Sequence, residues 1–255
     1  MTWQPIDAPP GEAPRPMTMR VQVIPPRCYY PEHCHQWYQM IYATDGALTV
    51  AAQEKSFVTS PKECVWLPPR IPHRVGSLYG AQFRSLWFAE DAGFDVPQNL
   101  TVFGITPLLK ELIVEAAAVV SQPVHEGYAD RVTGLIVDQF RRMKSITRSL
   151  PWPSGGSRLS TLCETLYANP ADSCGLKTWG DRLGMSERSL ARHFELEVGV
   201  TFRTWRRLLR LHKALEMLSS GMDVTQTALE LGYGSTSAFV FAFRTEMGYS
   251  PGHMR

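Results

Sequence analysis

The segment HCHQWYQ, which begins at His33, contains the residue types most capable of chemistry in this chain. In a β-strand alternate side chains point to one face, so His33, His35, Trp37 and Gln39 would share a face. His73, in the segment PPRIPHRV, could join them from a neighbouring strand. Imidazole nitrogens bind Zn, Ni, Cu or Fe, and they also form hydrogen bonds with organic molecules. The segment therefore predicts either a metal site or the wall of a small-molecule pocket.

The two interpretations use nearly the same residues. The metal hypothesis takes His33, His35, Gln39 and His73 as ligands of a divalent transition metal, while the pocket hypothesis adds Trp37. A neutral amide is a weaker ligand for a hard metal than a carboxylate is. No carboxylate shares the face of the histidines, whereas an enzyme would need an acid or base beside the metal. We therefore favour a pocket for an organic effector and expect no enzyme activity. A bound divalent transition metal is the alternative, and the sequence requires no cofactor.

Residues 17–104 must position these side chains, and they read as a series of short strands. Segments such as MRVQVI, QWYQMIYAT and FRSLWFAE alternate in polarity and are separated by Pro, Gly and Asp. That regularity is typical of a small β-barrel or jelly roll. Residues 105–148 change to helical spacing, as in TPLLKELIVEAAAVVSQ. Two helices after a barrel could cover it or pair with a second copy, and we predict a homodimer through them.

The composition of the chain and the positions of its Pro- and Gly-rich segments indicate the class of protein and the limits of its domains. The 255 residues are 44% hydrophobic and 20% charged with a net charge of +2, which is ordinary for a globular protein. No apolar run approaches the roughly 18 residues needed to span a bilayer, so we expect a cytoplasmic protein with no membrane partner. The Pro-rich residues 1–16 predict a flexible tail, and residues 149–157 predict a linker.

An internal repeat occupies residues 158–255. Leu190 and Phe194 recur 49 positions later as Phe239 and Phe243, and each copy follows a turn that contains glycine, LGMS or LGYGS. Each copy reads as a helix, a short turn and a second helix, which is the helix-turn-helix pattern. Between the copies, RTWRRLLRLHKALEMLSS predicts one long helix with a basic face and an apolar face.

The segments RRLLRLHKALEML and ALELGYGSTSAFVFAFRTEMGYSPGHMR resemble the DNA-binding domain of the AraC/XylS family. Together with HQWYQMIYATDGALTV upstream, the chain looks most like the NimR-like subgroup of that family. The resemblance implies a two-domain α+β fold, with a cupin-like β-barrel and helices followed by an all-α domain of two helix-turn-helix units. His33, His35, Gln39 and Gly46, followed by P-x-x-P-H ending at His73, also resemble the two cupin motifs. Gln39 stands where cupins have a metal-binding Glu.

The family resemblance implies a sequence-specific transcription regulator. Its cupin-like domain would sense a small-molecule effector and control how the DNA-binding domain is presented. The expected partners are double-stranded operator DNA, the effector, a second copy of the chain and RNA polymerase. Two alternatives keep the same residues: a metal-sensing regulator that uses His33, His35 and His73, and a cupin enzyme fused to a DNA-binding module.

The predicted DNA contacts follow from how a recognition helix enters the major groove, by its N-terminal part. Arginine can bridge guanine O6 and N7, whereas an apolar side chain can only touch a thymine methyl group or follow shape. We therefore predict that the first unit supplies most of the base discrimination and that the linking helix contacts phosphates. The predicted residues are Arg188, Ser189, Ala191 and Arg192 in the first unit, Arg206 and Arg207 in the linking helix, and Thr236, Ser237, Val240 and Phe241 in the second unit.

Overall fold

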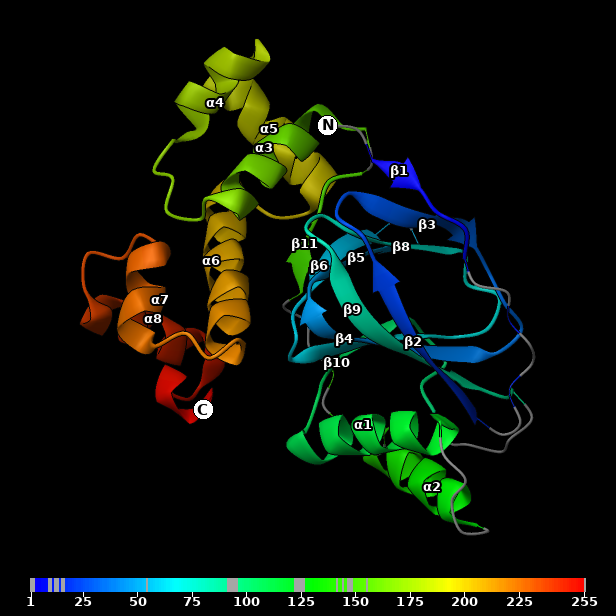
Figure 1. Ribbon diagram of the computed structural model, residues 1–255. Coiled ribbons are helices and arrows are strands. Elements are labelled where there is room, and N and C mark those ends of the chain that lie inside the picture. Colours follow the sequence, from blue (N-terminus) through cyan, green and yellow to red (C-terminus); the bar gives the residue numbers. More distant parts are fainter. Residues whose placement is uncertain are drawn as a thin grey trace. The chain divides into compact units, whose positions relative to one another are not determined.

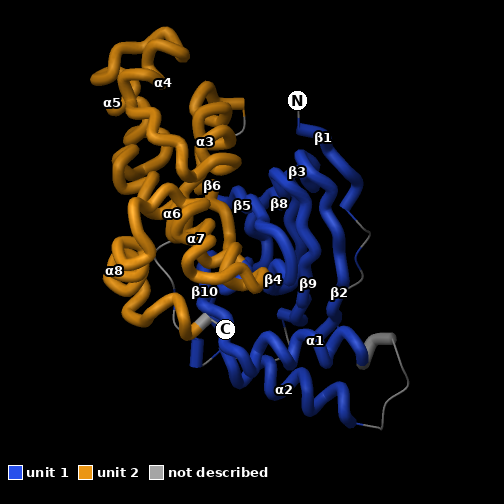
Figure 2. Tube along the Cα trace, turned by 60° about the vertical axis from the view of Figure 1, so that its left-hand side comes forward, with its two compact units in different colours: residues 1–54, 61–147 blue, residues 55–60, 148–255 orange. Residues whose placement is uncertain are grey.

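The computed structural model describes residues 3–8, 11, 14, 17–53, 55–90, 96–121, 127–140, 142–143, 145, 149–154 and 156–254. The chain forms two compact units (Figure 2). Unit 1 comprises residues 1–54 and 61–147, and unit 2 comprises residues 55–60 and 148–255. Strand β6 (Lys55–Thr59) is therefore grouped with the C-terminal helices, although it lies inside the segment predicted as the barrel.

Unit 1 is built on two β-sheets (Figure 1). In one sheet the strand order is β1 (Gln4–Pro5), β3 (Cys28–His33), β8 (His73–Ser77) and β5 (Leu48–Ala52). In the other it is β10 (Thr101–Gly104), β7 (Glu63–Leu67), β4 (Tyr38–Gly46), β9 (Ala81–Phe88) and β2 (Met17–Ile24). Neighbouring strands are antiparallel except for β1 and β3. The predicted β-rich N-terminal domain is confirmed.

The predicted flexible tail is in part a strand. β1 runs parallel to β3, and the backbone N–H groups of Gln4 and Ile6 donate to the carbonyls of Arg27 and Tyr29, both at 2.9 Å. Backbone groups that pair with a sheet are held in it because leaving them unpaired costs free energy. Gln4–Ile6 therefore belong to the sheet, so this part of the segment is not a loose tail.

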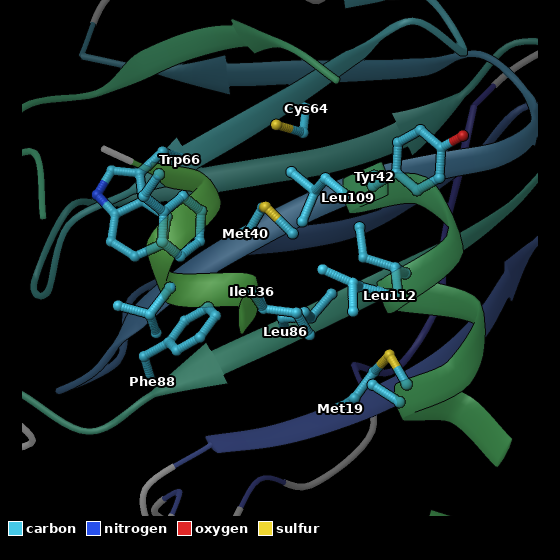
Figure 3. Close-up of a cluster of buried hydrophobic side chains, with 14 of the residues drawn as sticks. Met19, Met40, Tyr42, Cys64, Trp66, Leu86, Phe88, Leu109, Leu112 and Ile136 are labelled. Atoms are coloured by element: carbon cyan, nitrogen blue, oxygen red, sulfur yellow. The ribbon is translucent and has the colours of Figure 1, made fainter. Parts of the chain in front are cut away.

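Two helices, α1 (Pro107–Ser121) and α2 (Tyr128–Phe140), close the core of unit 1. Leu109 and Leu112 of α1 and Ile136 of α2 pack in one buried cluster with strand residues such as Met40 and Trp66 (Figure 3). The apolar stripes thus cover a sheet, as in the first of the two arrangements predicted from the sequence, covering the barrel or pairing with a second copy. The reason is that the side chains on that face of the sheet have to be shielded from water. Any contact with a second copy would fall to their outer faces. None of the described helices is long and apolar enough to cross a membrane.

Gly46, at the end of β4, is fixed by two constraints. Its φ is +72°, and a Cβ there would lie 2.3 Å from the carbonyl oxygen of Gly80. We expect Gly46→Ala to lower the free energy of unfolding by at least about 2 kcal/mol, because left-handed strain and steric overlap add. Gly134→Ala is the matched control, since a Cβ added at this helical position would meet no atom of another segment within 4 Å. It should be neutral or stabilising by up to about 1 kcal/mol. Equal urea midpoints for the two variants would contradict the prediction.

Unit 2 contains the predicted pair of helix-turn-helix units. The first is α4 (Leu176–Leu183) with α5 (Glu187–Val198), and the second is α7 (Val224–Glu230) with α8 (Thr236–Met247). The long helix α6 (Phe202–Ser219) joins them, α3 (Arg158–Ala168) precedes them and a 3-10 turn (Pro251–Met254) follows. The hydroxyls of Ser186 and Ser235 cap α5 and α8 by accepting from backbone N–H groups. The all-α C-terminal domain with two helix-turn-helix units is confirmed.

The first residues of the predicted linker belong to the core of unit 2. Strand β11 (Leu150–Pro151) pairs antiparallel with β6, and the Trp152 side chain is buried. Trp205 of α6 donates its indole N–H to the carbonyl of Pro151 at 2.7 Å, and its ring lies 6.1 Å from that of Trp152. Residues 150–152 are therefore not a free connection, because a buried tryptophan pair supplies more packing than the Pro- and Gly-rich composition suggested.

Candidate effector pocket and nucleic-acid interface

Three of the predicted histidines meet in unit 1. His33 ends β3 and faces His73, the first residue of β8, across the strand pair. Their ring centroids are 4.4 Å apart, and the ring of His35 lies 5.1 Å from that of His73. The segment HCHQWYQ is not one strand, however: it spans the end of β3, a bend and the start of β4. Strand alternation is therefore not the reason why the side chains meet: the bend together with the β3–β8 pairing brings the rings together.

Each of these imidazoles has its Nδ1 at hydrogen-bond distance from a backbone carbonyl two residues away. A carbonyl oxygen only accepts, so each Nδ1 carries a proton and a neutral ring presents Nε2 as a lone pair. The distances are 2.8 Å for His33 to Pro31, 2.8 Å for His35 to Trp37 and 2.9 Å for His73 to Ile71. The backbone thus fixes the tautomer of all three rings.

Gln39 is buried on β4 and links His35 to strand β9. Its Oε1 lies 2.7 Å from Nε2 of His35, and its Nε2 donates to Oγ of Ser85 at 2.6 Å. Trp87 donates its indole N–H to the same hydroxyl at 2.8 Å. Burial lowers the pKa of His35, which favours an uncharged ring with a single N–H. With its proton on Nδ1, the neutral His35 ring accepts at Nε2. In the opposite orientation of the Gln39 amide, the NH₂ group donates to this nitrogen and the amide oxygen accepts from the Ser85 hydroxyl, so that every group of the uncharged network has a partner.

The arrangement gives the metal hypothesis no added support. In the part of the chain that the structure describes, no group of three or more His, Cys, Asp or Glu side chains could hold a metal ion. His35 and Gln39 are also engaged with each other. Two members of the ligand set predicted for a metal, His35 and Gln39, are thus in contact with each other, and the metal site at His33, His35, Gln39 and His73 stays a hypothesis.

The residues instead border a cavity of about 190 Å³. His33, His35, Trp37 and Gln39 line it, as predicted for a pocket wall, whereas His73 is not among the lining residues and is fully buried. The remaining lining residues were not predicted from the sequence: Ala8, Gly11, Gln22, Tyr30, Cys34, Val75, Phe83 and Trp87. Alternation within one strand could not have found them, because Cys34 lies next to the bend after β3, where alternation puts it on the opposite face, and the others come from β2, β3, β8, β9 and the N-terminal segment.

Aromatic rings form one side of the cavity. His35 and Trp37 are stacked, with an interplanar angle of 3° and centroids 5.2 Å apart, and Trp37 lies 4.9 Å from Trp87. Gly11 borders this group, since a Cβ there would lie 2.6 Å from the Trp87 ring. The indole N–H of Trp37 is buried and has no hydrogen-bond partner among the described residues. A buried donor without a partner costs free energy, so this atom is where a bound molecule would gain most.

His73 should make unit 1 sensitive to acid. Burial lowers its pKa to about 3, because a charged imidazole in that place would lose its hydration. An unfolded chain binds the proton near pH 6.5. The free energy of unfolding should therefore be unaffected by this group above about pH 6.5 and fall below it, by up to about 1.4 kcal/mol per pH unit, until about pH 3.

Urea unfolding of the wild-type protein and of His73→Phe between pH 7 and pH 4 checks the acid prediction. The variant should lose the part of the slope that this histidine contributes. His253→Phe serves as the control, because that side chain is exposed in unit 2. Parallel pH dependences for the wild type and His73→Phe would rule the assignment out.

In unit 2 the predicted base-reading residues lie on outward faces. On α5, Arg188, Ser189 and Arg192 are exposed and Ala191 is half-buried, while Leu190 and Phe194 point into the core. On α8, Ser237 is exposed, Phe241 is 75% exposed, Thr236 and Val240 are half-buried, and Phe239 and Phe243 are core residues. The exposed face of α5 near its N-terminus therefore presents two arginines beside Glu187, whereas the corresponding face of α8 is uncharged.

The two arginines predicted to contact phosphates have different environments. Arg206 is half-buried, and its guanidinium donates to the carbonyls of Pro170, at 3.3 Å, and Asp172. Burial lowers the pKa of Arg206. Arg206 thus anchors the loop between α3 and α4, which leaves its guanidinium only partly exposed, and its phosphate contact stays a prediction. Arg207 keeps a side chain that is 60% exposed, paired with Glu246 at 3.1 Å.

Comparison with protein-family models matches both units. Residues 20–104 match the AraC-like ligand binding domain, and residues 179–255 match a helix-turn-helix domain. The HTH-type transcriptional regulator NimR of Escherichia coli K12 is 31% identical over 222 residues, which are 87% of this chain and 81% of that protein. The uncharacterized HTH-type transcriptional regulator YbfI of Bacillus subtilis is 20% identical over 82% of this chain and 80% of its own length.

Among solved structures, ToxT from Vibrio cholerae aligns over 94% of this chain and 97% of its own, with 12% identity and a TM-score of 0.39. At that TM-score the likeness carries no inference about the pocket or the DNA-contacting helices.

Proposed function

Because the chain belongs to the AraC family of transcription regulators, which pair an N-terminal ligand-binding domain with a DNA-binding helix-turn-helix domain, we propose how its two units divide the work. Unit 1 binds an uncharged organic effector in the cavity beside His35 and Trp37. Unit 2 reads operator DNA mainly through α5. The observation that carries this division is the exposed pair Arg188 and Arg192, on a helix whose other face is fully buried.

The charge distribution supports unequal roles for the two recognition helices. Arginines at the N-terminal part of α5 can make bidentate hydrogen bonds to guanine in the major groove. At the matching positions α8 offers Ser237 and the exposed Phe241, so its readout rests on apolar contact and DNA shape. On the linking helix α6, Arg207 is more exposed than Arg206 and is therefore the better candidate for a phosphate contact.

The effector acts by favouring one arrangement of the DNA-binding units over another. A ligand shifts such an equilibrium only if it binds the two arrangements with different affinities. We propose that the protein works as a homodimer through the outer faces of α1 and α2, where Leu108, Val114 and Leu135 are about half exposed. We propose RNA polymerase as a further partner. We also propose that the protein is located in the cytoplasm, where it can reach operator DNA. The relatives are transcription regulators, so an enzyme fused to a DNA-binding module has no support from them.

Selection from a random pool of double-stranded DNA tests the proposal and identifies the operator sequence at the same time. The full-length protein should enrich a defined sequence, and positions within it should lose information when Arg192 is changed to alanine. Enrichment of no sequence, with binding that depends on salt alone, would mean that the protein binds DNA only through its charge and would overturn the proposal.

A further inference from the structure

We propose that the cavity of unit 1 takes a small, planar, uncharged aromatic molecule that accepts a hydrogen bond from the indole N–H of Trp37. The inference deepens the proposed function, on which it rests, by naming the chemical class of the effector. Four properties of the cavity carry it: its size, its aromatic wall, its lack of charge and its unpaired donor.

The size limits the ligand to about one ring. The cavity measures about 190 Å³. An apolar cavity of about 150 Å³ inside a protein accommodates benzene, so this one holds a single ring with a small substituent. Sites for drug-sized ligands have volumes of about 300–1,000 Å³. A long acyl chain or a polycyclic molecule would therefore not fit within this volume.

The wall favours a flat, aromatic molecule. His35, Trp37 and Trp87 contact one another in series as an aromatic surface. Tyr30 and Phe83 line the cavity as well, with ring centroids 6.4 Å apart. Aromatic faces gain from offset stacking and edge-to-face contacts beyond simple burial of area. A saturated ring of the same volume would fill the space without those contacts.

The lining favours an uncharged ligand. Among the described residues that line the cavity there is no carboxylate, ammonium or guanidinium group. The guanidinium of Arg20 lies 4.3 Å from the Trp87 ring centroid but is not part of the lining. An ion placed here would lose its hydration without gaining an opposite charge.

The polar atoms specify one substituent. The indole N–H of Trp37 is buried and, within the described part of the chain, unpartnered, so it needs an acceptor. The backbone contact of His33 through Nδ1 leaves its Nε2 as an acceptor for a donor on the ligand. A group that both accepts and donates, such as a primary carboxamide on an aromatic ring, satisfies both.

Benzamide is a probe with these features, and three analogues remove them one at a time. Benzoate has the same shape with a negative charge, benzamidinium has a positive charge, and cyclohexanecarboxamide keeps the polar group without the aromatic ring. Binding to the full-length protein is measured by calorimetry and by ligand-observed NMR. We expect benzamide to bind at least about tenfold more tightly than each of the three analogues.

Trp37→Phe tests the hydrogen bond separately, because it keeps an aromatic ring and removes the N–H. Benzamide should bind about tenfold more weakly to this variant, while toluene, which accepts no hydrogen bond, should bind both proteins alike. A far-UV circular dichroism spectrum like that of the wild type and a cooperative thermal transition without probe establish that the variant is folded.

The outcomes separate this inference from the proposed function. Preference for benzoate or benzamidinium would overturn the uncharged class, and equal binding of cyclohexanecarboxamide would overturn the aromatic one. If no probe binds at millimolar concentration while the protein still selects a DNA sequence, the ligand class is wrong and the proposed DNA-binding function stands. If the protein selects no DNA sequence although benzamide binds, the proposed function fails and the ligand class stands.

Discussion

Replacing both Arg188 and Arg192 with alanine should remove sequence-specific DNA binding. Each bidentate contact of an arginine with guanine contributes about 1–3 kcal/mol of discrimination, so the pair should cost about 2–6 kcal/mol. That is a loss of affinity between about 30-fold and more than 10,000-fold for the preferred duplex. Binding to an unrelated duplex should change far less, because it depends on the total charge in contact with phosphates.

The structure makes this pair suitable for the test. Both side chains are exposed on α5, and within the described residues neither takes part in an ion pair, so their removal should leave the helix intact. Lys55→Ala with Arg70→Ala is the matched control, since both of these residues are exposed outside α1, α2 and the helix-turn-helix units and the change in net charge is the same. Fluorescence anisotropy against the selected and an unrelated duplex gives both affinities. If both double variants lost the same affinity for the selected duplex, the α5 arginines would contribute only through their charge, and the prediction would be wrong.

Trp205→Ala should be the most destabilising single change in unit 2. Trp205 is fully buried in α6, its ring lies 5.7 Å from Phe194 of the recognition helix, and its N–H donates to Pro151. Truncating a buried tryptophan to alanine costs about 3–5 kcal/mol. Trp205→Phe should cost less, because it retains most of the ring contacts and loses the hydrogen bond to the β11 carbonyl.

Urea unfolding followed by far-UV circular dichroism gives the free energies, with DNA binding as a second readout. Leu196→Ala is the control on α5: that side chain is 76% exposed, so its removal should change stability by no more than about 0.5 kcal/mol. A Trp205→Ala protein as stable as the Leu196→Ala protein would show that the Trp152–Trp205 contact does not hold the start of unit 2 in place.

The helical half of the fold could be predicted because its signals are local. Helical periodicity, capping residues and glycine turns specify α4, α5, α7 and α8 within short windows, and the 49-residue repeat shows that one unit occurs twice. The same periodicity separated Leu190 and Phe194, which are buried, from Arg188 and Arg192, which are exposed.

Periodicity could not separate Arg206 from Arg207. The two residues are neighbours on the basic side of α6, and a helical pattern specifies which side a residue is on but not what packs there. The loop between α3 and α4 covers Arg206 and leaves Arg207 exposed. The surroundings of Arg206 therefore depend on residues that lie some 35 positions away in the sequence, at Pro170 and Asp172.

By itself, the sequence of this protein determined the order of its elements, the two helix-turn-helix units and the group of histidines worth examining. Only the tertiary structure decided that His73 meets His33 across β3 and β8, that Gln39 is occupied by His35, and that β1 pairs with β3. The physical reason is the range of the interactions. Capping and periodicity act over a few residues, whereas strand pairing, the choice of a hydrogen-bond partner and the sealing of a cavity depend on segments that the chain brings together only on folding.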